Sequence, residues 1–578
     1  MNIMFGIFNG ENVNLVNGEP SISLGKEEEN LLITYDGEFY NSEELRAILQ
    51  GLGYRLKGES DSELIANAYQ AWGEECPKKF NGAFSFCIYD KEKETLFLAR
   101  DQAGKKFLYY SNYNGKFLFS SQVKSIIETP RFPREIDLSA LNFFFALRCI
   151  PVDLCIFKYI KKLPAGCSIL FNLKSKETRI QKYWDPPISE PEAGNENELL
   201  DELEGLLEDA TRVRMRGDAP VGAFLSGGLD SSLVVALMSK LSSQRIKTFS
   251  VGFRLNKYNE LPYSRIVARY FGTDHKEVTV EPNFDSFLES ASIFDEPLGD
   301  PSIFPTFYGA KLAGEDVNVV LSGDGADSLF LGTKTHRLTK RYGKIRKFFV
   351  PPIDWISGRV AELVPEEAKW RIFIENLTPE EFFTRRELLF GNSLRRKLFQ
   401  DWVLEELKHN FDEPDHDIEY KTGTLTERMM FAEFYSHRNN SIFKVETTAR
   451  SFSLNVRSPF LDTRVVEFAF SKVPGDLKIR GNVTKYLLKQ LARKFLPPDF
   501  PFNRKQGLNP PFSEWLRNEW RDYLWDILMS GEERYLDRKF IRKLVERHKN
   551  PAFDQGRKLF ALLVFKIWER KYLSGDGF

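Results

Sequence analysis

Cysteine is scarce in this chain of 578 residues, and its distribution excludes two common uses of the thiol. The five cysteines all lie at or before position 167, and none belongs to a C-x-x-C pair. An odd, scattered set speaks against both a disulfide framework and a zinc site, so we expect small buried side chains. They are Cys76, Cys87, Cys149, Cys155 and Cys167.

The chain also lacks an excess of either charge and any long apolar run. Lys and Arg total 81 against 82 for Asp and Glu, whereas nucleic-acid-binding proteins normally carry a basic excess. No apolar run reaches the roughly 20 residues of a membrane span. The first ten residues lack the basic and apolar regions of a secretory signal. We therefore expect a cytoplasmic protein with neither a nucleic-acid nor a membrane partner.

Residues 1–185 show short apolar runs separated by turn signals, with two helical patterns between them. This alternation is typical of antiparallel hairpins in an α+β domain. Residues 186–197 are rich in Pro, Glu and Asn and are predicted to form a linker. The expected strands are Asn30–Tyr35, Phe84–Tyr89, Thr95–Ala99, Phe107–Tyr110, Lys116–Ser120 and Ser168–Asn172, and the helices are Ser42–Leu52 and Ser62–Gly73.

From residue 198 to residue 578 strands alternate with helices at first, which predicts a parallel sheet in an α/β domain. Beyond about residue 335 the patterns are almost all helical. The expected strands are Val221–Leu225, Lys247–Phe253, Lys276–Val280 and Val317–Leu321. The expected helices are Glu198–Arg214, Ser231–Leu241, Pro262–Phe271, Phe284–Ile293 and Ile303–Leu312.

A glycine-rich turn follows the first of these strands, with the string S-G-G-L-D-S-S at 226–232. Gly227 and Gly228 permit close backbone approach, and the helix that follows offers N–H groups to an anion. Asp230 cannot donate to a phosphate, so its carboxylate is better suited to Mg²⁺. No lysine follows the glycines, which excludes the Walker A pattern. Ser226, Ser231 and Ser232 add hydroxyl donors, and the whole string resembles that of the ATP pyrophosphatases.

A second glycine-rich string, S-G-D-G-A-D-S at 322–328, follows the last predicted parallel strand. Open α/β sheets bind ligands at the carboxyl ends of their strands. Asp230 and Asp327 are therefore expected to share one Mg²⁺ beside bound ATP.

Across nearly its full length the sequence resembles the asparagine synthetase family. The resemblance implies an N-terminal glutaminase-like domain of the N-terminal-nucleophile type and an ATP-pyrophosphatase domain (adenine nucleotide α-hydrolase-like) with a largely helical C-terminal part. The matching strings are S-G-G-L-D-S-S at 226–232, F-S-V-G-F at 249–253, E-P-x-x-D-P-S at 296–302, S-G-D-G-A-D at 322–327, R-S-P-F-L-D at 457–462 and R-K-x-G at 504–507.

The resemblance also implies roles for single residues. Asp230 and Asp327 match magnesium-binding positions, and Asp324 matches an acidic position at the reaction centre. Lys505 matches a lysine that stabilises charge as an adenylate forms and breaks. Glu446 is a candidate for proton transfer, because family members often carry an acidic residue upstream of R-S-P-F-L-D. Nucleotide-contacting positions are matched by Leu225, Val251, Ser322 and Gly323.

The N-terminal half matches the family less completely. The string Y-D-G-E-F-Y-N at 35–41 resembles the glutamine-site motif N-G-E-x-Y-N, and Asp61 falls at another glutamine-contacting position. The family nucleophile is a cysteine at position 2, where this chain has Asn2. The R-G-P-D segment is absent, and the stretch between Gly10 and Asp36 is short. We therefore expect a retained domain without glutaminase activity.

Several functions remain open on the sequence alone. The first is an amide ligase that activates aspartate, or another carboxylate, as an adenylate for attack by ammonia or another amine. The second is an intramolecular cyclase, like β-lactam synthetase or the lasso peptide macrolactam enzymes, which also lack the N-terminal cysteine. Ser328 and Leu331 depart from the usual asparagine synthetase pattern, which weakens the assignment of aspartate. A tRNA-modifying enzyme and a non-catalytic scaffold are further alternatives, and a homodimer is open as well.

Overall fold

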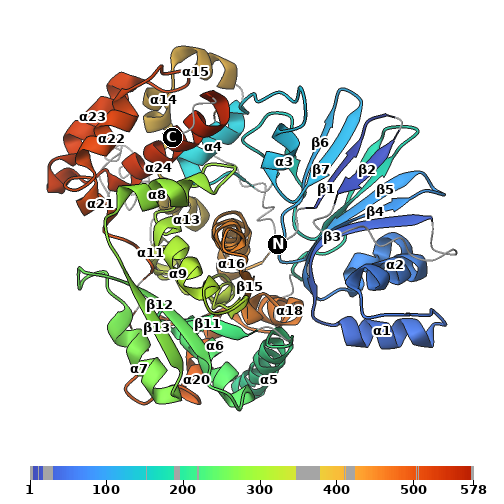
Figure 1. The fold of residues 1–578 in the computed structure, drawn as a ribbon. Coiled ribbons are helices and arrows are strands. Elements are labelled where there is room, and N and C mark those ends of the chain that lie inside the picture. Colours follow the sequence, from blue (N-terminus) through green and yellow to red (C-terminus); the bar gives the residue numbers. More distant parts are fainter. Residues whose placement is uncertain are drawn as a thin grey trace.

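The computed structural model describes residues 4–10, 12–16, 30–151, 153–187, 195–217, 220–346, 378–408, 411, 423–502, 504 and 507–574. Lys505 and most of the predicted linker, 188–194, lie outside these residues. The described chain forms an N-terminal part of two sheets and a larger part built from a parallel sheet and many helices (Figure 1).

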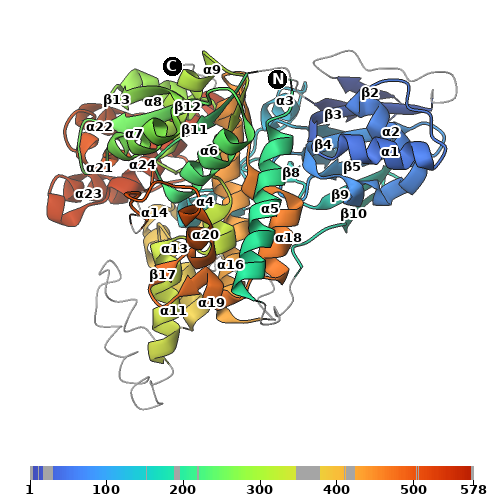
Figure 2. The same ribbon diagram turned by 90° about the horizontal axis from the view of Figure 1, so that it is seen from below.

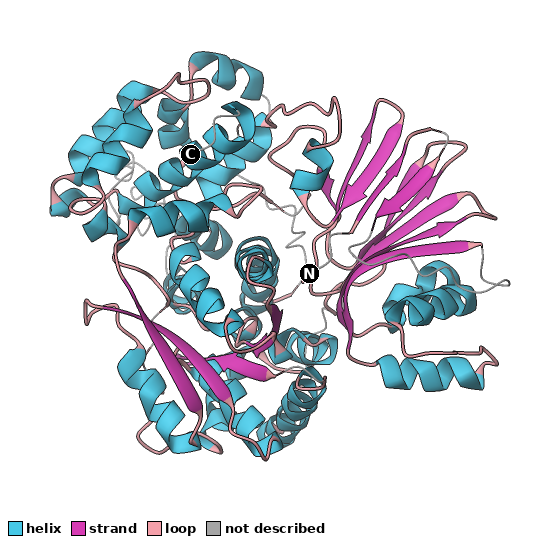
Figure 3. Ribbon diagram, viewed as in Figure 1, coloured by secondary structure: helices cyan, strands magenta, loops and turns pink. Residues whose placement is uncertain are grey.

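Two five-stranded antiparallel sheets stack in the N-terminal half (Figure 3), in the orders β2-β1-β7-β6-β8 and β10-β9-β5-β4-β3. Apolar side chains from both fill the space between them, and the rings of Phe117 and Phe171 stack at 4.3 Å between centroids. The strands are β1 (Phe5–Phe8), β2 (Val13–Val16), β3 (Leu31–Phe39), β4 (Gly82–Asp90), β5 (Thr95–Arg100), β6 (Tyr109–Tyr113), β7 (Lys116–Ser120), β8 (Lys161–Lys162), β9 (Cys167–Asn172) and β10 (Thr178–Lys182).

Helices cover the outer face of the second sheet. Leu45 and Leu49 of α1 and Leu64 and Ile65 of α2 are buried in one cluster with Phe84 and other side chains of that sheet. Ser60 caps α2, because its hydroxyl accepts a hydrogen bond from the Glu63 N–H. The helical elements of this half are α1 (Ser42–Gly51), α2 (Asp61–Trp72), η1 (Gly73–Lys79), α3 (Val123–Ile127) and α4 (Leu138–Leu147).

The six strands and two helices predicted for this half are present with small shifts at their ends, but β8, β10, η1, α3 and α4 were not predicted. The strand expected from Phe107 begins at Tyr109, and β1 and β2 were not expected because their four-residue patterns are too short to recognise. All five cysteines are buried and free, as predicted.

The second half contains a five-stranded parallel sheet in the order β13-β12-β11-β14-β15. The sequence predicted its first four strands. The fifth, β15, comes from the region expected to be almost all helical, and its three residues are too few to show a period. These strands are β11 (Val221–Phe224), β12 (Lys247–Phe253), β13 (Asp274–Val280), β14 (Val319–Leu321) and β15 (Asn455–Arg457).

Helices pack on both sides of this sheet. The first, α5, begins at Glu196, and the Asn195 side chain caps it by accepting from the Asn197 N–H. The last two residues of the predicted linker therefore belong to the helix. The helices up to residue 346 are α5 (Glu196–Arg214), α6 (Leu229–Leu241), α7 (Leu261–Phe271), α8 (Phe284–Ser292), α9 (Ile303–Gly314), α10 (Ala326–Phe330) and α11 (Lys334–Arg346).

The described residues beyond 346 are mostly helical, as predicted. The exceptions are β15 and the small hairpin of β16 (Ile479–Arg480) and β17 (Val483–Thr484). The helical elements are α13 (Pro379–Glu387), α14 (Asn392–Leu398), α15 (Asp401–Leu407), α16 (Leu425–His437), η3 (Arg438–Ile442), α17 (Phe443–Arg450), η4 (Pro459–Leu461), α18 (Thr463–Ser471), α19 (Gly475–Lys478), α20 (Tyr486–Arg493), α21 (Phe512–Trp515), α22 (Arg521–Met529), α23 (Arg538–His548), η5 (Pro551–Phe553), α24 (Gly556–Glu569) and η6 (Arg570–Ser574).

The helix α4 belongs to the N-terminal half in sequence but not in space. In Figure 1 it lies among the helices of the C-terminal part. The ring of Phe145 contacts the rings of Phe390, Phe399 and Phe565 at 5.4 to 5.9 Å between centroids. The predicted boundary at residue 185 therefore does not separate two independent cores.

Seen from below, α5 and α18 lie between the parallel sheet and the N-terminal sheets (Figure 2). Among the described helices, none combines the length and the apolar character that crossing a membrane requires.

Candidate functional site

The first glycine-rich loop joins β11 to the start of α6, as the sequence predicts. Gly227 has φ of +72°, and a Cβ there would lie 2.5 Å from the backbone nitrogen of Ser264, so only glycine fits. The Ser231 hydroxyl lies 3.0 Å from that of Ser226 and also accepts from the Ser226 N–H at 3.2 Å. These contacts hold the loop against the N-terminus of α6, whose first N–H groups lack helical partners and suit an anion.

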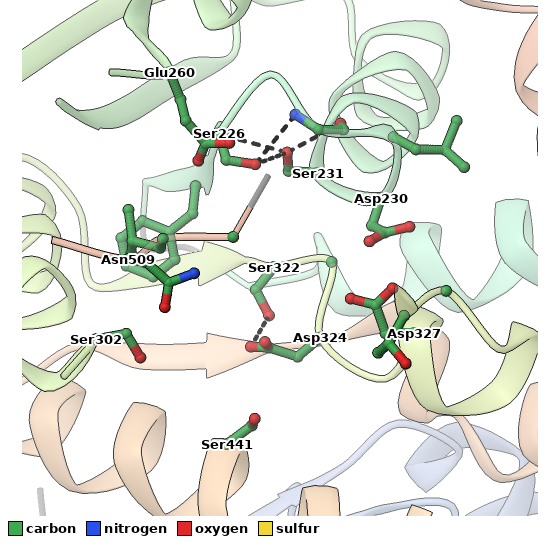
Figure 4. A pocket seen from close by; sticks show the side chains of 18 of the residues that line it. Ser226, Asp230, Ser231, Glu260, Ser302, Ser322, Asp324, Asp327, Ser441 and Asn509 are labelled. Carbon is green, nitrogen blue, oxygen red and sulfur yellow. Dashed lines mark hydrogen bonds between the residues drawn. The ribbon is translucent and has the colours of Figure 1, made fainter. Parts of the chain in front are cut away.

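The second loop joins β14 to α10 at the neighbouring strand end. The Ser322 hydroxyl donates to Asp324 Oδ2 at 2.8 Å (Figure 4), and the Ser458 hydroxyl donates to the Asp324 carbonyl. Gly323 lies so close to α6 that a Cβ there would meet Asp230 Cβ at 2.7 Å. The two loops therefore pack directly on each other, as their places at adjacent strand ends require.

Asp230 and Asp327 converge on one cation, which is the ammonium of Lys485. Lys485 Nζ lies 2.6 Å from both carboxylate oxygens of Asp230 and 2.6 Å from Asp327 Oδ1. Burial lowers the pKa of Lys485, but the two carboxylates outweigh burial and raise it above its ordinary value. Two carboxylates aimed at one buried cation position form a donor set that fits Mg²⁺, which also takes oxygens from water and phosphate.

A pocket of about 1030 Å³ opens over the two loops. Such a volume lies at the upper end of the range for small-molecule sites and is large enough for a nucleotide with a second substrate. Predicted residues that line it are Leu225, Ser226, Gly228, Asp230, Ser231, Val251, Ser322, Gly323, Asp324 and Asp327.

Three of the predicted site residues that the structure describes do not line this pocket. Gly227 lies on the side of the loop that packs against the backbone of Ser264, and Ser232 in α6 is fully buried. Glu446 points away, and its Oε1 pairs with Lys105 Nζ at 2.5 Å. Lys505 lies outside the described residues, although its neighbours Arg504 and Gly507 line the pocket.

Sequence reasoning missed several charged residues of the pocket. Lys485 could have been suspected from its position directly before α20. A lysine is unfavourable at the positive N-terminal end of a helix, so its presence there indicates a compensating negative partner. Lys444 Nζ contacts Asp300 Oδ2 at 3.1 Å and the Ser302 hydroxyl at 2.6 Å. Burial alone would raise the pKa of Asp300, but the positive charges of Lys444 and Arg148 outweigh burial and hold this pKa below its ordinary value. No pattern in the sequence linked these distant positions.

Arg148 reaches the pocket from the N-terminal half. It ends α4 in the left-handed region with φ of +70°, and its carbonyl accepts from the Gly299 N–H at 2.7 Å. The pocket is therefore built by both halves of the chain.

The string at 35–41 covers the end of β3 and the turn into α1, at the contact between the two halves. Asp36 Oδ2 accepts from Arg450 Nη2 at 3.0 Å, and Glu38 accepts two hydrogen bonds from Arg457. Burial alone would raise the pKa of Glu38, but the pairing of Glu38 with the Arg457 guanidinium outweighs burial and lowers this pKa. Burial raises the pKa of Asp61 to about 6, although Arg46 opposes the shift.

The sequence matches two family models and several curated proteins. The model described as asparagine synthase matches residues 202–570, and that of a glutamine amidotransferase domain matches residues 18–184. Asparagine synthetase (glutamine-hydrolyzing) 1 of Bacillus subtilis (strain 168) is 30% identical over 97% of this chain and 89% of its own length. A putative asparagine synthetase (glutamine-hydrolyzing) 2 of Methanocaldococcus jannaschii is 36% identical over 67% of this chain and 76% of its own.

A putative asparagine synthetase (glutamine-hydrolyzing) of Mycobacterium tuberculosis (strain CDC 1551 / Oshkosh) is 28% identical over 94% of this chain and 85% of its own. The matches therefore extend over both halves of the molecule. Together with the paired glycine-rich loops, they show that this chain belongs to the asparagine synthetase family, whose members are ATP-dependent ligases that form carbon–nitrogen bonds.

Proposed function

We propose that this protein forms an amide by activating a carboxylate, aspartate by default, as its adenylate. The carboxylate attacks the α-phosphorus of ATP and pyrophosphate leaves; ammonia or another amine then attacks the acyl carbon and AMP leaves. The observation that carries the proposal is the convergence of Asp230 and Asp327, from two glycine-rich strand ends, on a single cation position inside the pocket.

The residues of the pocket suit the two halves of this reaction. The N–H groups at the start of α6, together with the hydroxyls of Ser226 and Ser231, would bind phosphate oxygens. Leu225, directly after β11, and Val251, within β12, would offer apolar contacts for the adenine ring. Asp324 lines the same space, where an acidic group suits a reacting amine.

Mg²⁺ and Lys505 complete the proposal. Asp230 and Asp327 would hold the ion, which when bound neutralises phosphate charge. Lys505 follows Arg504, which lines the pocket, and we assign to Lys505 the stabilisation of negative charge that the family resemblance implies.

We further propose that the amine does not come from glutamine hydrolysed by this chain. Asp36 and Glu38 of the motif-like string are engaged by Arg450 and Arg457. The five cysteines are all buried, and burial raises the pKa of Cys76 and Cys87 well above the ordinary value, which disfavours a thiolate nucleophile. Purified protein should release no glutamate from glutamine at glutaminase rates, and such release would contradict this part of the proposal.

The test is pyrophosphate release from ATP and Mg²⁺ with a panel of carboxylic acids. We expect release with aspartate plus ammonia. If only a peptide or a β-amino acid supports release, the intramolecular cyclase is the correct member of the family. If no acid supports release and ATP does not bind, the ligase proposal fails.

The matched variants are Asp230→Asn and Asp285→Asn, which remove one carboxylate each from the first turn of a helix. Asp230→Asn should reduce pyrophosphate release on the order of 10²-fold or more, because it removes a metal ligand. Asp285→Asn lies on the exposed side of α8 and should leave the rate unchanged. Normal turnover by Asp230→Asn would refute the site assignment.

A further inference from the structure

The acidic residues of the string at 35–41 point across the contact between the two halves. Asp36 pairs with Arg450 at 3.0 Å, and Arg457 donates to the two oxygens of Glu38 at 2.8 and 2.5 Å. Gly37 between them has φ of +145°, and a Cβ there would lie 2.1 Å from the Ala83 carbonyl oxygen. The tight pairing of β3 with β4 therefore fixes the direction of both carboxylates.

The first of these contacts ends on α17, whose two faces have different neighbours. Phe443, Glu446 and Arg450 follow helical spacing and all face the N-terminal half. Lys444 and Val445 face the pocket on the other side. A shift of α17 against the N-terminal sheets would therefore move pocket residues as well.

Charge on the N-terminal side holds that face of α17 in place. Lys105 Nζ lies 2.5 Å from Glu446 Oε1, and Lys106 Nζ lies 3.6 Å from its other oxygen and 3.4 Å from Asp36. Burial lowers the pKa of Lys106, but Asp36 and Glu446 outweigh it and raise the pKa. Buried charges of this kind are tolerated only when they are paired, so the cluster favours one geometry.

The second contact ends on β15, beside the second glycine-rich loop. The Arg457 carbonyl accepts from the Ser322 N–H at 2.9 Å, and its guanidinium is the group held by Glu38. Lys105 Nζ also donates to the Val456 carbonyl at 3.0 Å. Glu38 is therefore connected to the backbone of the proposed nucleotide loop through a single residue, Arg457.

We propose that the remnant of the glutamine-site motif serves as a docking element within the molecule. Asp36 and Glu38 act as positioning residues that hold α17 and β15 where the nucleotide pocket requires them. Glu446 takes part in the same docking contact, because it pairs with Lys105 and Lys106 on the face of α17 that is turned away from the pocket. This role gives the N-terminal domain a use that does not depend on glutamine hydrolysis. The inference rests on the proposed nucleotide site.

The experiment uses the full chain and two isosteric variants, Asp36→Asn and Glu38→Gln. Hydrogen exchange measured by mass spectrometry should be faster in peptides that cover 319–328 and 441–458, and unchanged in peptides from α1 and α7. ATP binding measured by calorimetry in the presence of Mg²⁺ should weaken by about tenfold, because small displacements of positioning groups have large effects. The melting temperature of Asp36→Asn should fall, because Lys106 and Arg450 lose one partner in a buried cluster, and the peptides from α1 and α7 then separate a local loosening from a general one.

The matched control is Glu43→Gln, which breaks an exposed ion pair with Arg216 across the same contact. It should leave both exchange and ATP affinity unchanged. Exchange and affinity in Asp36→Asn and Glu38→Gln equal to those of Glu43→Gln would overturn the inference. If the wild-type chain does not bind ATP at all, the proposed function fails instead, and hydrogen exchange alone still tests the docking. Should Glu38→Gln not fold, Asp36→Asn carries the test.

Discussion

At the scale of single residues, the site depends on charges that the fold brings within reach of one another. Asp230, Asp327 and Lys485 are separated by up to 255 positions in the chain, yet both carboxylates contact the buried ammonium of Lys485. The two aspartates carried a recognisable pattern, since each follows a strand and a glycine-rich turn. Lys485 carried only an unfavourable helix position, so the sequence did not identify it as part of the site.

Replacing Lys485 by methionine should open the cation position. Without the ammonium, the two carboxylates lose the positive charge that neutralises them, so a divalent ion should bind more readily. We expect the affinity for Mn²⁺ in the absence of nucleotide to rise by about tenfold or more, measured by electron paramagnetic resonance. Lys489→Met, which changes another lysine of the pocket, is the control. An unchanged affinity in Lys485→Met would show that the lysine does not compete with the metal.

Asp61→Asn should stabilise the protein at neutral pH. The pKa of Asp61 is raised to about 6 by burial, so its ionised form destabilises the folded state above that pH. This destabilisation disappears as the pH falls toward the unfolded-state pKa of about 3.9. After allowance for its partial exposure and its favourable first-turn position, we expect a gain of about 1 kcal/mol at pH 7.5. The gain should shrink at pH 4.5 in urea unfolding, and a gain that does not depend on pH would contradict the assignment.

At the scale of elements, the loops at the strand ends position the site by close backbone packing. Leu331 ends α10 with φ of +55°, a conformation that costs a non-glycine residue about 1 kcal/mol. Its side chain is completely buried, and this burial offsets the strain. The departure from the family pattern at this position is therefore accommodated by packing.

The next residue, Gly332, lies in a closely packed part of the same loop. A Cβ at this position would lie 1.8 Å from Asp327 Oδ1 and 2.1 Å from Lys485 Cε. Gly332→Ala should therefore displace both groups and slow pyrophosphate release on the order of tenfold or more. Gly205→Ala is the control, because a Cβ in that part of α5 meets nothing within 4 Å. Equal rates for the two variants would contradict the geometry of the loop.

At the scale of the whole molecule, the two halves share parts that the sequence assigns to only one of them. The helix α4 packs among the C-terminal helices, and Arg148 at its end lines the pocket. The strand β15 completes the parallel sheet from a segment more than 130 residues beyond β14. The spacing of apolar residues indicates only the local helix or strand, so it cannot predict contacts between segments that are far apart in the chain.

Phe145→Ala should weaken the molecule as a whole. The ring is fully buried against Phe390, Phe399 and Phe565, so its removal leaves a cavity in the core that joins the halves. We expect a loss of about 3–5 kcal/mol and a lower melting temperature. Calorimetry should show the N-terminal sheets and the C-terminal helices destabilised together. Phe553→Ala removes an exposed ring and should have little effect, and a similarly small effect for Phe145→Ala would show that α4 does not join the halves.

The sequence by itself determined the alternation of β11 to β14 with the helices between them, the two glycine-rich loops and the carboxylates Asp230 and Asp327, because each depends on residues that are neighbours in the chain. Only the tertiary structure decided that Lys485 pairs with those carboxylates, that Glu446 faces away from the pocket and that Asp36 and Glu38 contact the other half. These features depend on which faces of α17, α20 and β3 meet, and burial and charge pairing settle that choice only once the whole chain is folded.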